Sequence, residues 1–236
     1  MTEILRIHTF AGAAGLPTTG PFSLKLGMAL RMAGIPFEFH VDPDLKRSPK
    51  RKIPWVERGD VQMADSELIL AWLGVDLERG LTPRERAEGL ALRTLVEEHW
   101  HQVLEYELIL DPTGLAWMME RVPAPMREAV GGGMRRHFEH HLYERGMGRH
   151  ARDEITAFGR KDLDAVAAWL GEREWSIGSE PTLTDASLFG LLTPPVYLPI
   201  ATPSFSYAKT LAPITAFVER CRARYFPEVP SAPVSP

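Results

Sequence analysis

Apolar and polar positions in the first third of the chain switch between strand-like and helix-like spacing. Residues 4–10 and 37–41 are short runs rich in β-forming side chains, which predicts two strands. Between them, apolar residues recur every three or four positions, and Pro21 and Gly34 stand where a helix would begin and end. The pattern predicts a strand–helix–strand unit whose two strands are parallel.

The next apolar runs predict a hairpin followed by a second helix. Residues 55–57 and 61–63 flank Arg58-Gly59-Asp60, which suits a glycine-containing hairpin loop. Residues 66–77 then return to helical spacing. An antiparallel hairpin added to a parallel pair gives a four-stranded mixed sheet, in the order of the thioredoxin fold. We therefore predict a thioredoxin-like α/β domain over residues 1–78.

From Thr82 onward the pattern is helical almost throughout. Thr82 and Glu85 form a capping-box sequence and open a long helix that Asp111-Pro112 ends. Further helices are predicted by the same spacing over residues 115–145, 153–170, from 182 onward and 214–225. We therefore predict an all-helical bundle domain over residues 82–225.

Prolines and glycines mark the expected breaks in this second domain. Pro123, Pro125 and the run Gly131-Gly132-Gly133 are expected to interrupt the helices of residues 115–145. The last stretch, residues 226–236, contains four prolines, which predicts an extended or disordered tail.

Composition and charge are those of an ordinary soluble globular protein. The chain has 236 residues, 44% of them apolar and 25% charged, and its net charge of −4 gives no reason to expect nucleic-acid binding. No stretch approaches the ~20 apolar residues of a membrane span, and Met1–Arg6 shows no basic segment followed by a long apolar run, so no signal peptide is expected. Cys221 is the single cysteine, which excludes an intrachain disulfide and a paired-cysteine redox centre. We expect a cytoplasmic protein with neither a nucleic acid nor a membrane as partner.

The first candidate for chemistry is Pro54, which follows a bulky residue just before the predicted hairpin. At this place in a thioredoxin fold the proline is typically cis, and the bend exposes main-chain groups that can pair with an extended peptide ligand. An ordinary trans turn is the alternative. The basic run of residues 46–52 would steer an anionic ligand or form a solvated loop, and Lys52, nearest to Pro54, is the candidate contact.

Two predicted helix starts offer further candidates. Asp65 or Ser66 would cap the second helix, and free amides at such a start bind carboxylates; plain capping is the alternative. At the first helix, Thr18, Thr19 or Ser23 would place a hydroxyl in the helix dipole, where it can donate to a thiolate and lower the pKa of the thiol. Capping by Thr19 or Ser23 is the alternative there.

These segments together resemble the cytosolic glutathione transferases, and more closely their failed-axon-connections and metaxin-like branch, which has bacterial members. The resemblance spans about residues 5–225 and is carried by Pro21–Lys25, Leu30–Glu38, Ser48–Val56, Ala64–Ser66, Gly146–His150, Lys161–Ala165 and Gly178–Ala186. It implies a two-domain plan, a glutathione site on the first domain, and a homodimer.

The resemblance also implies roles for particular residues. Pro54 would be the cis-proline, and Trp55 would pair its main chain with the cysteinyl part of glutathione. Asp65 and Ser66 would hold the γ-glutamyl end, and Lys52 would lie near the glycyl carboxylate.

The start of the first helix departs from the family pattern. This branch commonly has Ser-Pro-Phe-Cys there, whereas this chain has Gly20-Pro21-Phe22-Ser23. Gly20 has no side chain to activate a thiol, and Ser23 replaces the cysteine, so thiol–disulfide exchange at this site is excluded. Thr19 is the first choice as the hydroxyl that acts on glutathione, with Thr18 or Ser23 and the main-chain amides as alternatives.

Other polar groups are expected to be structural. Thr182 and Asp185 match the helix-capping box of the family, and Asp185 is spaced to bond back to the Thr182 amide. His137, His140 and His141, with Glu144, have the spacing of a helical metal face, but a solvated helix face is the stronger expectation because no further ligand is apparent.

The preferred function is that of a glutathione transferase, with glutathione as cosubstrate and no metal. A small apolar electrophile would bind against the helical domain. The residues that would either line its pocket or belong to the ordinary core are Trp100, Tyr106, Trp117 and Met118-Met119. The rival is a non-catalytic binding or scaffold protein that kept the fold and lost the residue that activates the thiol.

Overall fold

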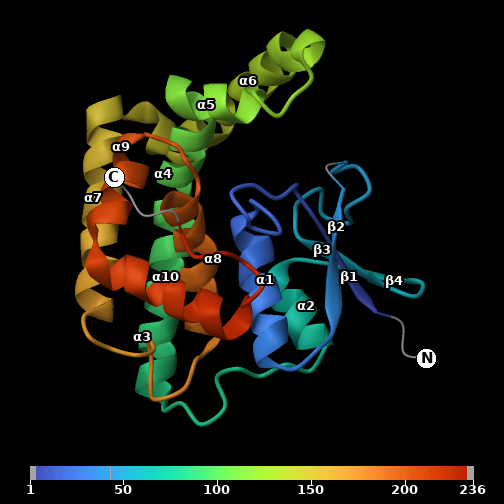
Figure 1. Ribbon diagram of the computed structural model, residues 1–236, viewed down its shortest axis with the longest axis vertical. Coiled ribbons are helices and arrows are strands. Elements are labelled where there is room, and N and C mark those ends of the chain that lie inside the picture. The colour runs from blue at the N-terminus through green and yellow to red at the C-terminus, as the bar shows by residue number, and fades with distance from the viewer. Residues whose placement is uncertain (1–3, 43, 233–236) are drawn as a thin grey trace.

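The structure is a computed structural model that describes residues 4–42 and 44–232. An α/β domain is followed by an all-helical domain, in the order predicted from the sequence (Figure 1). The two domains lie side by side, and the sheet of the first domain is on the side away from the helical bundle (Figure 1).

The first domain is built on a four-stranded mixed sheet with strand order β2-β1-β3-β4. Strand β1 (Leu5–Thr9) pairs in parallel with β2 (Phe37–Val41) and antiparallel with β3 (Trp55–Arg58), and β3 pairs with β4 (Val61–Ala64) as the predicted hairpin. The predicted thioredoxin-like sheet is therefore confirmed.

Helices α1 (Pro21–Met32) and α2 (Ser66–Trp72) lie on one side of this sheet (Figure 1). Side chains alternate along β1, so that Leu5 and Ile7 are buried in the core while Arg6 is exposed. Close packing of α1 on β2 depends on Gly27, where an added Cβ would lie 2.8 Å from the Phe39 ring.

The second domain opens with one long helical stretch. It comprises α3 (Pro83–Thr94), the π-helical segment η1 (Leu95–Trp100), α4 (His101–Glu105) and a second π-helical segment, η2 (Tyr106–Leu110). The predicted capping box is present: the Glu85 amide donates to Thr82 Oγ1 at 3.2 Å, and the Thr82 amide donates to the Glu85 carboxylate at 2.8 Å. Asp111 ends the stretch as predicted and caps the next helix, α5 (Pro112–Met119).

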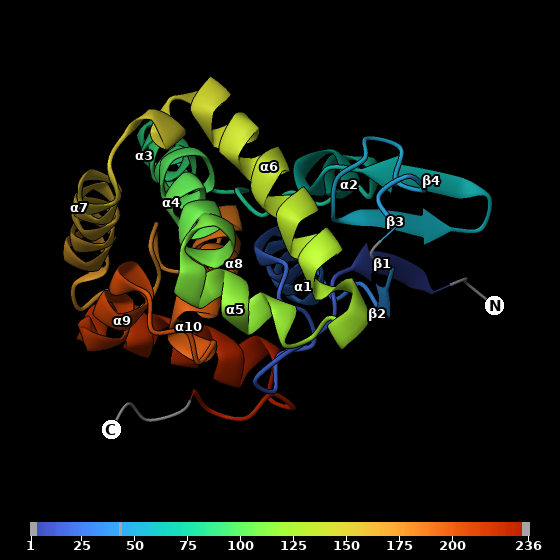
Figure 2. The same cartoon turned by 90° about the horizontal axis from the view of Figure 1, so that it is seen from above.

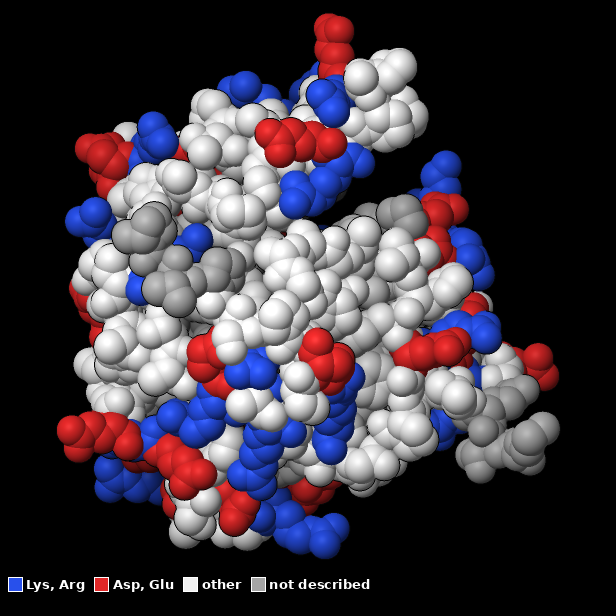
Figure 3. All heavy atoms as spheres, viewed as in Figure 1, with Lys and Arg blue, Asp and Glu red and all other residues white. Residues whose placement is uncertain are grey.

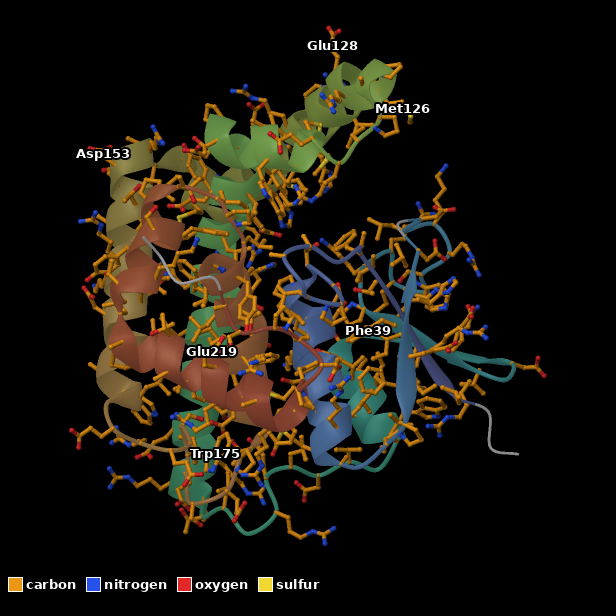
Figure 4. All side chains as sticks on the ribbon, in the orientation of Figure 1. Phe39, Met126, Glu128, Asp153, Trp175 and Glu219 are labelled. Atoms are coloured by element: carbon orange, nitrogen blue, oxygen red, sulfur yellow. The ribbon has the colours of Figure 1, made fainter. Side chains whose placement is uncertain are left out.

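Helices α5 and α6 (Arg127–Arg145), joined by the short turn η3 (Ala124–Met126), form an arm beside the first domain (Figures 1 and 2). Met126 and Glu128 lie at its tip (Figure 4). The prediction that Gly131-Gly132-Gly133 interrupts the helix is wrong, because α6 runs through all three. Gly131 instead allows a close approach to Met119, whose sulfur would lie 3.1 Å from an added Cβ.

Helix α8 (Leu183–Tyr197) is the buried centre of the second domain. On it pack α10 (Ala212–Tyr225) and α9 (Pro203–Thr210), the second of which the sequence pattern did not predict, and α7 (Arg152–Leu170) packs against both of these helices. Pro195 has no N–H for the Leu191 carbonyl, and Trp100 Nε1 donates to that oxygen at 3.0 Å. Within the described ranges, no helix is both long and apolar enough to cross a bilayer.

The predicted capping box at the start of α8 is also confirmed. The Thr182 amide donates to Asp185 Oδ2 at 2.8 Å. The buried Asp185 side chain also accepts a hydrogen bond from the Ser176 amide at 2.7 Å, so one carboxylate fixes both the helix start and the loop before it.

The domains are joined most closely where α1 packs on α8. An added Cβ at Gly190 would lie 2.4 Å from the Pro21 carbonyl oxygen, so the glycine allows the two helices to touch. Beside this contact Lys25 is fully buried, and its ammonium donates to Glu97 at 2.7 Å and to Glu67 at 3.1 Å. These ion pairs link α1 and α2 of the first domain to η1 of the second.

The described part of the tail, residues 226–232, has no helix or strand and packs on the protein. Phe226 is buried, and Glu228 pairs with Arg31 of α1 at 2.5 Å. The tail was predicted to be extended or disordered; in its described part, residues 227–229 form a turn closed by the hydrogen bond from the Val229 amide to the Phe226 carbonyl, and both of these side chains are buried. Residues 233–236 lie outside the described residues.

Candidate functional site

The segment before β3 makes the bend predicted at Pro54. The Ile53–Pro54 peptide bond is cis, which confirms that prediction. The loop that leads to it is held by the buried Ser48, whose hydroxyl donates to the Lys52 carbonyl at 2.7 Å. The loop therefore presents Lys52 and Ile53 in a fixed position ahead of the strand.

Trp55 begins β3 and has strand neighbours on both sides, His8 and Ala64. Both main-chain polar groups of a residue in an antiparallel strand point to one side, so those of Trp55 face a neighbouring strand. Its buried indole stacks on the His8 imidazole with 3.6 Å between ring centroids. In the part of the chain that the structure describes, the Ile53 main chain forms no such hydrogen bond. The main chain of Trp55, predicted to pair with a peptide ligand, is thus paired within the sheet on at least one side, and the open donor and acceptor beside the cis bond belong to Ile53.

A chain of buried hydroxyls lies behind the start of α1. Thr9 Oγ1 donates to Ser23 Oγ at 2.6 Å and lies 2.7 Å from Thr18 Oγ1, which accepts a hydrogen bond from the Gly20 amide at 3.0 Å. Thr9, Thr18 and Ser23 have no exposed surface. Ser23, one of the predicted donors to a thiol, is thus enclosed beneath the helix start.

At this helix start Gly20 has little room for a side chain, whereas Thr19 has a partly exposed one. An added Cβ at Gly20 would lie 3.1 Å from Ser23 Oγ and 3.4 Å from Thr18 Oγ1, so a side chain there would crowd the buried hydroxyls. Thr19 is half-buried, and its hydroxyl donates to the Ala11 carbonyl at 3.1 Å. Of the three predicted hydroxyls, Thr19 is the one that keeps exposed surface.

At the start of α2, Asp65 acts as the helix cap. Its Oδ1 accepts hydrogen bonds from the amides of Glu67 at 3.1 Å and Leu68 at 3.2 Å. The backbone of Asp65 has φ +84°, a conformation that a non-glycine residue rarely adopts and that is found most often at functional sites. Within the described chain, neither the amide nor the hydroxyl of Ser66 has a hydrogen-bond partner, so both remain open to a ligand.

The helical domain carries a cluster of titratable side chains near the start of α1, of which the sequence analysis named His141 but not Glu105. His101 of α4 packs edge-on against Phe22 of α1, with ring centroids 5.0 Å apart. One turn further along α4, the carboxylate of Glu105 lies 3.9 Å from His101, 3.8 Å from His141 and 3.6 Å from Arg145. Figure 3 shows the surface hollowed between the arm and the first domain, with Lys and Arg side chains along the upper wall.

Burial and charge shift the protonation of this cluster. Burial raises the pKa of the Glu105 carboxyl to about 6, although the positive charges of Arg145 and Lys52 oppose the shift. Burial lowers the pKa of His101 to about 3, and the same two cations add to that effect. At neutral pH His101 is therefore uncharged, and Lys52 acts electrostatically on side chains across the domain boundary.

Of the residues suggested as electrophile-pocket lining or ordinary core, Trp100 lies in the core and Tyr106 and Trp117 pack against it. Trp100 is fully buried and belongs to the core. Tyr106 lines a hollow with His140 and Tyr143, while Trp117 on α5 packs under the guanidinium of Arg121.

A second polar cluster lies on the outer face of the sheet. His8, His40 and Asp42 offer ligand atoms within 4.8 Å of one another, and no other group of three or more metal-binding side chains comes together in the described ranges. Arg47 Nη1 lies 2.6 Å from Asp42 Oδ2, so a guanidinium already supplies positive charge there. The helix face of residues 137–144 does not form such a group.

Two family models match the chain. A model described as the glutathione S-transferase N-terminal domain matches residues 21–114, and one described as the glutathione S-transferase C-terminal domain matches residues 159–221. Together they cover about two thirds of the sequence: the first match runs from α1 of the first domain to the start of α5, and the second lies within the helical domain.

Relatives and solved structures agree with these matches. The chain is 26% identical to Failed axon connections of Drosophila melanogaster over 250 residues, covering 96% of this chain but 59% of that protein's length. It is 25% identical to the isoprene-epoxide–glutathione S-transferase of Rhodococcus sp. strain AD45 over 237 residues, covering 94% and 99%. The solved structure of the β-etherase LigF of Sphingobium sp. strain SYK-6 has a TM-score of 0.63 at 17% identity, covering 97% of this chain and 100% of the other.

Proposed function

Because the chain belongs to the glutathione S-transferase superfamily, we propose that it binds glutathione on its first domain and joins the thiol sulfur to a small electrophile held against the helical domain. The cis Ile53–Pro54 bond carries this proposal, since it leaves the main-chain donor and acceptor of Ile53 open. Groups placed in this way pair with an extended peptide, and glutathione is a tripeptide that supplies a nucleophilic thiol.

The residues around this bend suit the two charged ends of glutathione. The Ile53 main chain would pair with the cysteinyl part, beside Trp55, whose stacked indole fixes the strand start. The amide and hydroxyl of Ser66, at the positive end of α2, would donate hydrogen bonds to the γ-glutamyl carboxylate. Asp65 Oδ2, which does not take part in the helix cap, would accept a hydrogen bond from the ammonium group. Lys52, which is exposed just ahead of Pro54, would pair with the glycyl carboxylate.

Thr19 is the side chain we propose for activation of the thiol. It keeps exposed surface at the start of α1, where its hydroxyl would turn from the Ala11 carbonyl to the sulfur and, with the helix dipole, favour a thiolate. Ser23 would act indirectly, since its hydroxyl belongs to the buried chain with Thr9 and Thr18 that fixes the Gly20 amide.

The alternative is a protein that binds glutathione or another partner without catalysis. Gly20 favours this alternative. The related branch has a serine at this position, whereas Gly20 has no side chain, and an added side chain would crowd the buried hydroxyls of Ser23 and Thr18. In that case glutathione would bind through the same groove, but its thiol would keep its ordinary pKa.

Calorimetry and a conjugation assay separate these possibilities. We expect glutathione to bind the full chain, and Ser66→Ala to weaken binding by about tenfold, the loss of a hydrogen bond to a charged group. The matched control is Ser206→Ala, an exposed serine on α9. Thr19→Val is expected to lower turnover of chlorodinitrobenzene and raise the pKa of the bound thiol while binding persists. Absence of glutathione binding would refute the proposal, and binding without turnover by the unaltered chain would favour the non-catalytic alternative.

We also propose a homodimer. The large exposed apolar side chains include Leu68 and Trp72 on α2 and Leu90 on α3, which would be covered by a second copy. Light scattering would test this by measuring the molar mass of the unaltered chain and of Trp72→Glu. A monomeric mass for the unaltered chain that Trp72→Glu does not change would contradict the homodimer.

A reducing, cytoplasmic compartment completes the proposal, since glutathione is available there. Cys221 is compatible with any compartment, because it is buried and burial raises the pKa of its thiol well above the ordinary value. The chain would therefore not form disulfides with glutathione at that residue, and mass spectrometry after incubation with oxidised glutathione should show no adduct.

A further inference from the structure

His8 is a buried histidine whose two ring nitrogens are unpaired. It lies on the outer face of the sheet, since side chains alternate along β1 and those of Leu5 and Ile7 are in the core. Its side chain is 1% exposed, and among the described residues neither Nδ1 nor Nε2 forms a hydrogen bond. A neutral imidazole has one donor and one acceptor to satisfy, so an unpaired buried ring favours a ligand at one of its nitrogens.

Aromatic neighbours hold the His8 ring in place. Its imidazole stacks on the Trp55 indole with 3.6 Å between ring centroids, and His40 of β2 meets it edge-on at 4.9 Å. These contacts follow from the strand register, which pairs His8 with His40 on one side and with Trp55 on the other. Since the indole covers a face of the ring, a ligand approaches His8 at the ring edge, where the nitrogen lone pairs point.

Three side chains bring metal-binding atoms together at this edge. His8, His40 and Asp42 each offer one such atom, and the three atoms lie within 4.8 Å of one another. His8 Nδ1 is 3.4 Å from Asp42 Oδ2. Two ligand atoms of a tetrahedral Zn²⁺, each about 2.0–2.1 Å from the ion, are about 3.4 Å apart. This pair therefore has the spacing of two ligands of one ion, and the exposed His40 can rotate to become the third.

Glu57 is placed to orient His8 toward an ion. Its Oε2 lies 3.0 Å from His8 Nε2, and a small rotation would align this contact as a hydrogen bond. A histidine that binds a metal commonly donates its other ring N–H to a carboxylate, which leaves the lone pair of the first nitrogen for the ion. Glu57 is itself held by Gln62, whose side-chain amide donates to Oε1 at 2.9 Å. The pair Glu57 and His8 therefore directs Nδ1 toward Asp42.

Arg47 holds the carboxylate that the ion would share. Its Nη1 donates to Asp42 Oδ2 at 2.6 Å, and its guanidinium lies 5.7 Å from the centre of the Trp55 ring. The Arg47 side chain is 52% exposed and belongs to the loop before β3, so it can turn into solvent at little cost. A divalent ion has twice the charge of a guanidinium and also binds the two imidazoles, so it competes with Arg47 for Asp42.

We propose that His8, His40 and Asp42 bind a divalent transition-metal ion, Zn²⁺ being the ion that suits them, and that this ion displaces Arg47 from Asp42. Two imidazoles and one carboxylate are a donor set for Zn²⁺, whereas Mg²⁺ and Ca²⁺ prefer oxygen ligands alone. Three protein ligands leave a fourth position for water. The site is on the outer face of the sheet, and the thiol transfer proposed above needs no metal, so the two proposals are independent.

Calorimetric titration of the untagged full chain with Zn²⁺ tests this site. We expect one ion per chain, and binding at least about 100-fold weaker in His40→Ala and in Asp42→Asn, because each variant removes one of the three ligands. His40 is exposed, and Asp42→Asn keeps the side-chain oxygen that accepts from the Asp44 amide, so both variants should fold. Glu57→Gln should weaken binding by about tenfold, and Arg47→Met should tighten it by about tenfold because the competing cation is gone.

The matched control is His137→Ala. His137 and His141 lie one turn apart on α6 with parallel rings, 6.1 Å between centroids, and form another histidine pair that could take up Zn²⁺. This control should change the affinity by less than about twofold. Co²⁺ gives a second readout, since the visible absorption of a four-coordinate Co²⁺ should appear in the unaltered chain and be lost in His40→Ala. No Zn²⁺ binding by the unaltered chain, or binding that His137→Ala removes and His40→Ala does not, would overturn the proposal.

Discussion

Replacing Lys25 tests whether a buried ion pair holds the two domains together. In Lys25→Met the ammonium that donates to Glu97 and Glu67 is lost, while the apolar stem keeps its volume. Glu97 is only 16% exposed and would be left as an uncompensated charge, whereas Glu67 is half exposed and has Arg93 at 3.8 Å. Removing one partner of a buried pair costs about 3–5 kcal/mol, and with one carboxylate stranded we expect about 3 kcal/mol. For a chain of this size that lowers Tm by about 6–12 °C.

Urea denaturation followed by circular dichroism measures this loss. The double variant Lys25→Met with Glu97→Gln should recover at least about 2 kcal/mol, because no buried charge is then left without its partner. Lys50→Met, in the exposed loop before β3, serves as the control and should change the free energy of unfolding by less than about 0.5 kcal/mol. A loss below about 1 kcal/mol in Lys25→Met, or simple additivity in the double variant, would refute the reasoning.

Three further predictions concern packing, capping and pH. Gly190→Ala should cost about 1–3 kcal/mol in denaturation, because the added Cβ would lie 2.4 Å from a carbonyl oxygen of α1; Gly133→Ala, with open space around it, should instead stabilise α6 by up to about 1 kcal/mol. Asp185→Ala removes the acceptor of two buried amides and should lower stability by about 2–3 kcal/mol, and a loss below about 0.5 kcal/mol would contradict its capping role. The hydrogen bond from the Arg31 guanidinium lowers the pKa of Glu228. Their ion pair therefore stabilises the docked tail above the ordinary glutamate pKa, and this stabilisation is lost as pH falls through the lowered pKa. Hydrogen exchange of the tail amides should rise in that pH range, and Glu228→Gln should abolish the pH dependence.

Local sequence patterns predicted most of the fold, and the errors lie where distant residues decide the outcome. The capping boxes at Thr82 and Thr182 depend on residues three positions apart, so their spacing alone identified them. Gly131 would weaken an isolated helix, but its close contact with Met119 of the preceding helix makes the glycine compatible with a continuous α6. The tail was predicted from its prolines, whereas its packing depends on Arg31, which is nearly two hundred residues away.

In the candidate site, too, features set by neighbouring residues could be predicted and features set by distant residues could not. Pro54 could be placed from its position before the hairpin, and its cis bond is confirmed. The burial of Ser23 in α1 was not visible in the sequence, because it depends on Thr9 at the end of strand β1. Glu105 was missed entirely, since its environment is created by Arg145 and by burial between helices, and neither follows from the residues next to it.

The packing of residues 226–232 on α1 bears on how the protein is made. A ribosome releases the first domain long before it synthesises this segment, so the newly made N-terminal half lacks the salt bridge at Arg31 and its neighbouring contacts until translation is nearly over. A stalled or prematurely terminated polypeptide ending ahead of Phe226 would therefore display apolar surface on both halves, which chaperones and proteases recognise.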